Sequence, residues 1–175
     1  MKVVTYARVL VCLLILSPES VVAQSADSSS PEIMQIDGTK NPELIPQWSA
    51  WGYAFRIFSG GPRQLPTSVL AHVTPGEQTL IMKEADAAQQ VEAECLAKHR
   101  KILEGRGSKT AVDLDKDVRA LNLECRWATL RARDRILAGI SPEAQTALIA
   151  FVESTKAGTS LAIPKKDLAR FREPE

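Results

Sequence analysis

The 175-residue chain has few of the residues that catalytic and metal sites use most often. It contains two histidines and three cysteines, and only 5% of its residues are aromatic. The motifs G-x-S-x-G, H-E-x-x-H and C-x-x-C are missing, and so is a phosphate-binding glycine loop. His72 and His99 lie far apart in the sequence, without the neighbouring residues of a catalytic triad. We therefore expect that the protein is not an enzyme and that it holds no cofactor.

Acidic residues are abundant enough to leave one catalytic alternative open, a hydrolase or lyase that uses a pair of carboxyl groups. Such an enzyme requires a cleft in which two carboxyl groups meet and one of them has a strongly raised pKa. The sequence does not place any two acidic side chains together.

The chain also lacks an excess of charge of either sign. Lys and Arg number 22, against 21 Asp and Glu. Removal of residues 1–23 takes away Lys2, Arg8 and Glu19, and the remaining 20 basic and 20 acidic residues cancel. A protein that binds nucleic acid usually presents a positive surface. We therefore expect no nucleic-acid partner.

The first 23 residues have the pattern of a secretory signal peptide. Lys2 and Arg8 form a positive start, an apolar run follows at residues 9–16, and small residues at 21–23 suit cleavage. This run is too short to cross a bilayer, and no later segment approaches the ~18 apolar residues of a transmembrane helix. We expect an exported protein, periplasmic or extracellular, with no transmembrane segment after cleavage of the signal peptide.

Residues 24–35 are rich in Ser and Asp, which predicts a flexible N-terminal tail before a single helical domain at 36–175. Strand signals are almost absent, since no apolar alternation exceeds four residues. Helix-start patterns and apolar stripes instead predict four helices and one or two short amphipathic turns, at about 41–59, 74–104, 113–138, 141–156 and 161–175. The predicted fold is all-α and bundle-like, with a long central αα-hairpin between an aromatic helix and a shorter helix.

Cys95 and Cys125 are the two cysteines that remain after removal of the signal peptide. They lie on the apolar stripes of the two hairpin helices, at similar distances from the turn between them. If the second hairpin helix starts at Thr110 instead of Asp113, the mismatch between the two cysteines in their distance from the turn grows by ~4–5 Å. A disulfide then requires the two cysteines to be staggered along the hairpin. In an exported protein an even number of cysteines indicates disulfide pairing first. We expect a Cys95–Cys125 disulfide, which stabilises the fold by about 3.5 kcal/mol on the chain-entropy model.

A metal site is the alternative use of these cysteines. Cys95 and His99 are four residues apart and share a helix face, and Cys125 can supply a third ligand. A closed tetrahedral site needs four ligands, however, and His72 lies in a proline-rich connector. This alternative describes a metal-binding or metal-responsive periplasmic protein, and it requires both thiols to be reduced.

Aromatic residues are concentrated in the helix that precedes the hairpin. Trp48, Trp51, Phe55 and Phe58 follow the 3, 4, 3 spacing of one helical face. One interpretation is that this face packs against the hairpin as core. The other is an exposed surface that binds a protein, a peptide or a small apolar ligand. The second interpretation requires Trp48 and Trp51 to be partly exposed.

Charges are divided along the second hairpin helix. Acidic side chains lie near its start and basic side chains near its end, as the helix dipole favours: Asp113, Asp115 and Asp117, then Arg131, Arg133 and Arg135. These arginines and Arg126 lie near Trp127, which leaves an anion-binding patch as an alternative to a solvated helix end.

Two resemblances accompany this interpretation. The segment IDGTKNPELIPQW, from Ile36 to Trp48, resembles openings of exported bacterial proteins that are uncharacterised, and it implies no activity. The helix starts VTPGEQ and ISPEAQ resemble the L-T-x-x-Q repeats of small helical periplasmic stress chaperones. Here Gln78 and Gln145 follow the hydroxyl residue by four positions instead of three, and Val or Ile replaces Leu. From the residues and these resemblances, we expect an exported, non-enzymatic binding module of the bacterial cell envelope.

Overall fold

The computed structural model describes residues 32–60, 64–108 and 110–168. Along the chain its elements are β1 (Ile33–Asp37), η1 (Pro42–Leu44), α1 (Gln47–Ser59), α2 (Thr67–Leu70), α3 (Pro75–Glu104), η2 (Gly105–Ser108), α4 (Ala111–Gly139), α5 (Pro142–Lys156), β2 (Ser160–Pro164) and η3 (Lys165–Asp167). The predicted signal peptide at 1–23 and most of the predicted tail, residues 24–31, lie outside the described residues.

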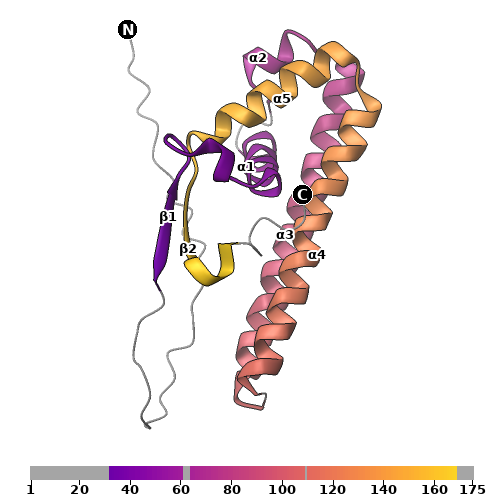
Figure 1. The fold of residues 1–175 in the computed structure, drawn as a ribbon. Helices are drawn as coiled ribbons and strands as arrows, with labels where there is room; N and C mark the ends of the chain where they lie inside the picture. The colour runs from indigo at the N-terminus through magenta and orange to yellow at the C-terminus, as the bar shows by residue number, and fades with distance from the viewer. Residues whose placement is uncertain (1–31, 61–63, 109, 169–175) are drawn as a thin grey trace, which may run out of the picture.

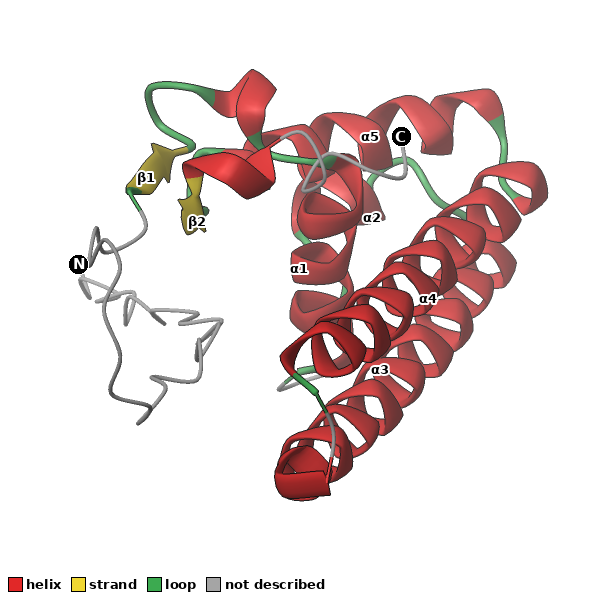
Figure 2. Cartoon of the chain, turned by 60° about the horizontal axis from the view of Figure 1, so that its bottom comes forward, coloured by secondary structure: helices red, strands yellow, loops and turns green. Residues whose placement is uncertain are grey.

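α3 and α4 run antiparallel as a long hairpin, and α1, α2 and α5 pack around one half of it (Figure 1, Figure 2). α3 begins with the predicted capping box, in which Thr74 and Glu77 exchange side-chain and backbone hydrogen bonds. The side chain of Thr110 caps α4, and that of Ser141 caps α5. The mostly α-helical class and the central αα-hairpin are therefore confirmed. Among the helices of the described ranges, none is both long and apolar enough to cross a membrane.

The main core forms where α1 and α5 meet the half of the hairpin that lies away from η2. The aromatic side of α1 packs in one cluster with residues of α3, α4 and α5. α5 crosses the end of the hairpin (Figure 1). Fully buried members of this core include Phe55, Phe58, Ile81, Ile136 and Leu148. Burial of aliphatic and aromatic side chains of this size stabilises a fold by about 1.5–3 kcal/mol each. The position of α1 is therefore fixed by the whole core, which includes α5, and not by contact with the hairpin alone.

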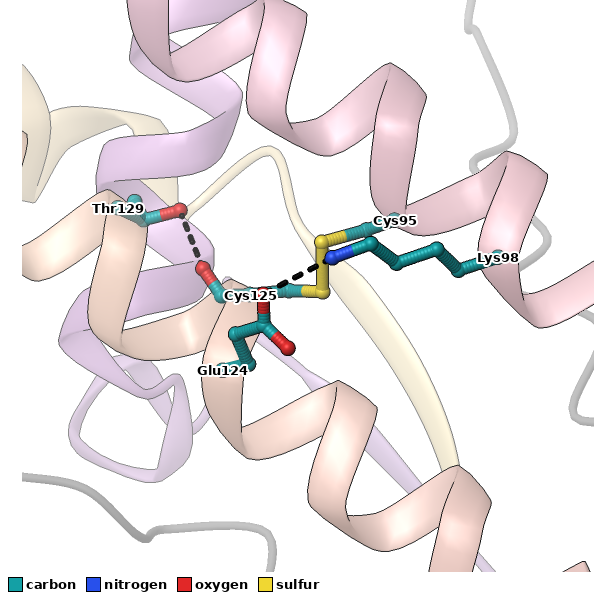
Figure 3. The surroundings of a disulfide bond; sticks show 5 residues. All are labelled: Cys95, Lys98, Glu124, Cys125 and Thr129. Carbon is teal, nitrogen blue, oxygen red and sulfur yellow. Dashed lines mark hydrogen bonds and ion pairs between the residues drawn. A yellow bond between two sulfur atoms is a disulfide. The ribbon is translucent and has the colours of Figure 1, made fainter.

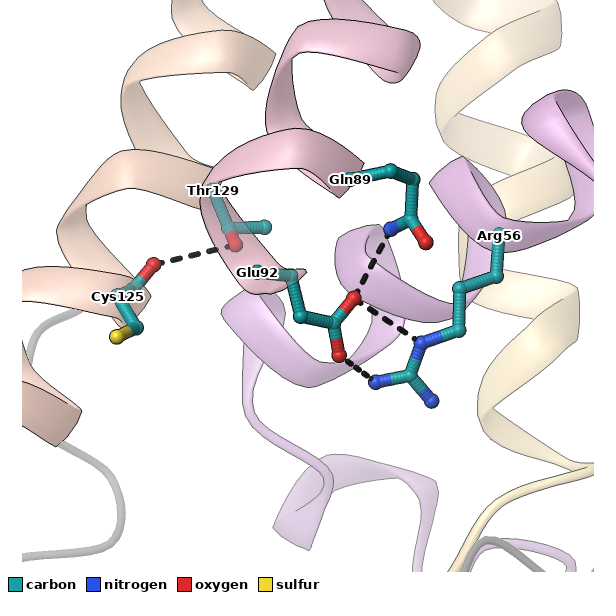
Figure 4. Close-up of polar contacts among 5 residues, drawn as sticks. All are labelled: Arg56, Gln89, Glu92, Cys125 and Thr129. Atoms are coloured by element: carbon teal, nitrogen blue, oxygen red, sulfur yellow. Dashed lines mark hydrogen bonds and ion pairs between the residues drawn. The ribbon is translucent and has the colours of Figure 1, made fainter. Parts of the chain in front are cut away.

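A partly buried ion pair also joins α1 to the hairpin. The guanidinium of Arg56 forms two hydrogen bonds with the carboxylate of Glu92 on α3, and its Nε lies 3.2 Å from Oε2 (Figure 4). Gln89 donates to the same Oε2 at 3.0 Å. A two-pronged contact of this kind fixes orientation as well as distance. Glu92 is close to the point where α3 leaves the cover of α1.

The predicted disulfide lies just beyond that point. Cys95 and Cys125 are bonded to each other, and their Cα atoms are 6.3 Å apart (Figure 3). One turn further along α3, the Nζ of Lys98 lies 3.0 Å from the Oε1 of Glu124. In the outer part of the hairpin, residues 93–124, the described side chains that are buried are those of Cys95, Leu114 and Leu121. The disulfide therefore joins the two helices where the apolar core becomes thin.

A small antiparallel sheet joins the two ends of the described chain, and the sequence analysis did not predict it. β1 pairs with β2, and Ile36 lies opposite Leu161. The predicted tail is therefore wrong for residues 33–35, which belong to β1, and the predicted helical turns are wrong for residues 161–164, which belong to β2. Each strand has only five residues, too few for a clear alternation. Their pairing is also long-range, so no local pattern could reveal it.

A second, smaller core covers this sheet. It contains four buried residues, Ile36, Ile45, Leu161 and Ile163, with Trp48 packed against them. Gly38 closes the sheet, because its backbone N–H donates to the Thr159 carbonyl at 2.9 Å. A Cβ at this position would collide with the Lys156 carbonyl. Position 38, in the turn after β1, can therefore hold only glycine.

Candidate functional site

A pocket of about 300 Å³ opens where α1, α4 and α5 meet. Its apolar walls are formed by one side chain from α1, one from α4 and two from α5: Trp51, Leu137, Ile149 and Val152. Ile149 and Val152 are three residues apart, so they lie on the same face of α5. Pockets for small ligands typically begin at about this volume. The site can therefore hold a small apolar group.

Polar side chains surround these walls. They are Gln47 from the first turn of α1, Arg133 and Asp134 from α4, and Glu153 from α5. The Nε2 of Gln47 donates to the Oε1 of Glu153 at 2.9 Å. The Nε of Arg133 donates to the Oδ1 of Asp134 at 2.8 Å, and the Arg133 side chain remains 27% exposed. The pocket thus combines an apolar interior with charges of both signs at its mouth.

Two carboxyl groups, those of Asp134 and Glu153, line this pocket. Burial raises the pKa of Glu153, but hydrogen bonds from Lys156 and Gln47 outweigh that effect and leave the pKa below its ordinary value. A general acid needs a pKa shifted in the opposite direction. Glu153 therefore does not have the raised pKa that one carboxyl group of such a pair requires.

Three of the four residues of the predicted aromatic face are buried. Phe55 and Phe58 are fully buried in the main core, and Trp51 is 2% exposed. Their rings contact each other, and Phe58 also contacts Phe151 of α5, with ring centroids 5.7 Å apart. The interpretation of these three residues as an exposed binding surface is therefore wrong. The cause is that α3, α4 and α5 together enclose this side of α1.

Two tryptophans of α1 have different positions. Trp51 contributes an edge of its buried ring to the wall of the pocket. Trp48 is partly exposed, packs on the second core and has the guanidinium of Arg126 4.6 Å from its ring centroid. Trp48 thus connects the sheet region to α4, and only Trp51 belongs to the pocket.

The residues of the metal alternative are not arranged as a ligand set. In the oxidised protein the sulfurs of Cys95 and Cys125 are bonded to each other, so neither is a thiolate. His72 lies between α2 and α3, and its Nδ1 is 2.9 Å from the Oε1 of Glu143 on α5. Over the ranges that the structure describes, no group of three His, Cys, Asp or Glu side chains is placed to hold a metal ion. The alternative with Cys95, His99 and Cys125 thus remains a prediction for a reduced protein.

No protein-family model matches the chain, and neither does any curated protein or any solved structure. The interpretation of the site therefore depends on its geometry alone.

Sequence reasoning missed most of the pocket, including Gln47, Asp134, Leu137 and Glu153, and named Arg133 only as part of a possible anion-binding patch near Trp127. Their meeting depends on how three helices cross, which no local pattern contains. Ile149 carried the one available signal. It is a large apolar residue beside the stripe of α5 formed by Leu148, Phe151 and Val152, and its side chain is 42% exposed.

Proposed function

We propose that this is an exported, non-enzymatic binding protein of the bacterial cell envelope that takes an apolar group into the α1/α4/α5 pocket. The ligand is a small apolar molecule or the apolar side chain of a peptide or protein. The observation that carries the proposal is the combination of Trp51, Leu137, Ile149 and Val152 around a 300 Å³ space. An exposed apolar concavity of this kind is the usual mark of a binding site.

The polar mouth sets the orientation of such a ligand. Arg133 is partly exposed, and its Nε and Nη2 atoms contact the Oδ1 of Asp134. Guanidinium groups bind carboxylates well. A ligand that has an apolar tail and a carboxylate head would therefore place its tail against Val152 and its head beside Arg133.

The sequence pattern at the N-terminus and the disulfide support the proposed export to the cell envelope. Residues 1–23 have a secretory pattern, and disulfides persist in oxidising compartments. The resemblance of Ile36–Trp48 to exported bacterial proteins points the same way. In the structure this segment supplies Ile36 and Ile45 to the second core, so its residue pattern is explained by packing and not by chemistry.

Octanoate is a suitable probe, because it combines a short acyl chain with a carboxylate. We expect octanoate to shift the NMR resonances of the Trp51 indole and the Val152 methyl groups of the oxidised protein in a saturable way. Ile149→Asp should weaken this binding at least tenfold, because it places a charge in the apolar wall of the pocket. Leu96→Asp is the matched control, since Leu96 is an exposed apolar residue of α3 that does not line the pocket.

Equal weakening by both substitutions would contradict a specific site, as would saturable shifts that leave Trp51 and Val152 unchanged. 1-Octanol provides a second comparison. It has the same tail without the carboxylate, so it should bind more weakly than octanoate to the wild type, and Arg133→Gln should weaken the binding of octanoate while leaving that of 1-octanol unchanged.

A further inference from the structure

The outer face of α4 carries two large apolar side chains that remain partly exposed. Leu123 is 42% exposed and Trp127 is 43% exposed. They are four residues apart and therefore adjacent on the helix surface. The disulfide residue Cys125 lies between them in the sequence and points the opposite way, toward α3 (Figure 3). Leu123 and Trp127 thus lie on the side of α4 that faces away from its hairpin partner.

Two charged residues extend this face in both directions. Lys116 lies seven residues before Leu123, and Asp134 lies seven residues after Trp127. Spacings of seven, four and seven keep all four side chains on one stripe of a helix. All four are exposed. We call these four residues, Lys116, Leu123, Trp127 and Asp134, the α4 stripe.

The α4 stripe is complementary to a second α4 stripe that runs in the opposite direction. Leu123 and Trp127 lie two residues on either side of Cys125, and Lys116 and Asp134 lie nine residues on either side of it. At 1.5 Å per residue these offsets are ~3 Å and ~13.5 Å along the axis in both directions. An antiparallel copy of α4 centred on Cys125 would therefore place Leu123 against Trp127 and Lys116 against Asp134.

We propose that the protein forms a two-fold symmetric dimer in which the α4 stripes of two copies pack antiparallel against each other. A two-fold axis makes each contact twice, so the pair has two Leu123–Trp127 contacts and two Lys116–Asp134 ion pairs. A parallel arrangement would place Lys116 against Lys116 and Asp134 against Asp134. Charge complementarity therefore selects the antiparallel copy as the occupant of this face.

The charges elsewhere on α4 agree with this arrangement. The first turns of α4 are acidic, with Asp113 and Asp115 exposed, and a later turn exposes Arg131 and Arg135. Antiparallel packing brings the acidic end of each helix toward the basic end of the other. Arg119 of one copy would also lie at the same height as Arg131 of the other. These two side chains lie on opposite edges of the stripe, however, and Arg119 already pairs with Asp115.

Sedimentation equilibrium of the full exported protein, oxidised and without added ligand, tests the dimer. We expect a monomer–dimer equilibrium within the range up to about 1 mM. Lys116→Asp should weaken the dimer about tenfold or more, because it converts both ion pairs into like-charge contacts, and Asp134→Lys should do the same. Trp127→Ala should also weaken it. Lys101→Asp, a charge reversal at an exposed position of α3 outside the stripe, is the matched control and should leave it unchanged.

A mixture of the two charge variants separates the interface from an effect on folding. Neither Lys116→Asp nor Asp134→Lys should dimerise well alone, but together they form a heterodimer in which both contacts again join opposite charges. Recovery of the dimer in the mixture would support the antiparallel α4 interface. A protein that remains monomeric at about 1 mM, or a dimer that is insensitive to these substitutions, would overturn it. The outcome is independent of ligand binding in the pocket, because no ligand is present.

Discussion

At the scale of single residues, Glu77 connects two helix starts that are far apart in the sequence. Its Oε2 accepts the N–H of Thr74 at 2.7 Å within the capping box of α3, and its Oε1 accepts the N–H of Ser141, the N-cap of α5, at 2.6 Å. Hydrogen bonds from the Thr74 and Ser141 backbones lower the pKa of Glu77 from 4.5 to about 2. The ionised side chain is therefore a link between α3 and α5.

This link predicts a dependence of stability on pH. Because the folded pKa is about 2 and the unfolded value is 4.5, the unfolded chain takes up this proton first as the pH falls. The contribution of Glu77 is complete above pH 4.5 and is lost between pH 4.5 and about 2. In urea unfolding across this range, Glu77→Gln should be less stable than wild type at neutral pH and should converge with it toward pH 2. Glu94→Gln, at an exposed position of the same helix, is the control, and the same convergence in that variant would contradict the assignment.

Phe55 tests whether the aromatic side of α1 is core. Phe55→Ala should lower the free energy of unfolding by about 3–5 kcal/mol, because the ring is fully buried and its removal leaves a cavity. Trp127→Ala removes a ring that is 43% exposed and belongs to neither core, so its loss of unfolding free energy should be clearly smaller than that of Phe55→Ala. Chemical denaturation of both variants at low protein concentration measures the difference. Similar losses in the two variants would contradict the placement of α1.

At the scale of elements, local signals decided which parts of the fold could be predicted. The hydroxyl caps at Thr74 and Ser141 lie next to the segments that they start, so the sequence contained both helix starts. The Cys95–Cys125 pairing followed from helix geometry in the same way, because both residues belong to one hairpin. β1 and β2 lacked such a signal, since each is short and finds its partner at the other end of the chain.

The hairpin depends on its disulfide in the part that no other helix covers. Cys95→Ala/Cys125→Ala should lower the free energy of unfolding by about 3.5 kcal/mol, because the 30-residue separation is no longer closed in the unfolded chain. The rate of amide hydrogen exchange should rise most in the parts of α3 and α4 that lie between the disulfide and η2, where few side chains are buried. A reductant should destabilise the wild type and leave the double variant unchanged. A loss below about 1 kcal/mol would contradict the role of the disulfide as the clamp of the outer hairpin.

At the scale of the whole molecule, three helices and a sheet convert a hairpin into a protein with an open pocket. β1 and β2 hold the two ends of the described chain together, and α3, α4 and α5 enclose the aromatic side of α1. The pocket lies where α1, α4 and α5 meet. Sequence reasoning expected a binding protein and placed its site on the aromatic stripe. It could not see that α3, α4 and α5 together bury Trp51, Phe55 and Phe58, or that Trp51 lines a pocket.

The central claim is that this pocket is the binding site. The most direct measurement is a set of intermolecular NOEs between octanoate and the methyl groups of the oxidised protein, labelled at Ile, Leu and Val. Binding in the pocket predicts contacts from the acyl chain to Leu137, Ile149 and Val152, which come from two helices and line the same space. Contacts to Leu96 or Leu123 instead, or contacts to no methyl group under saturating conditions, would contradict the claim.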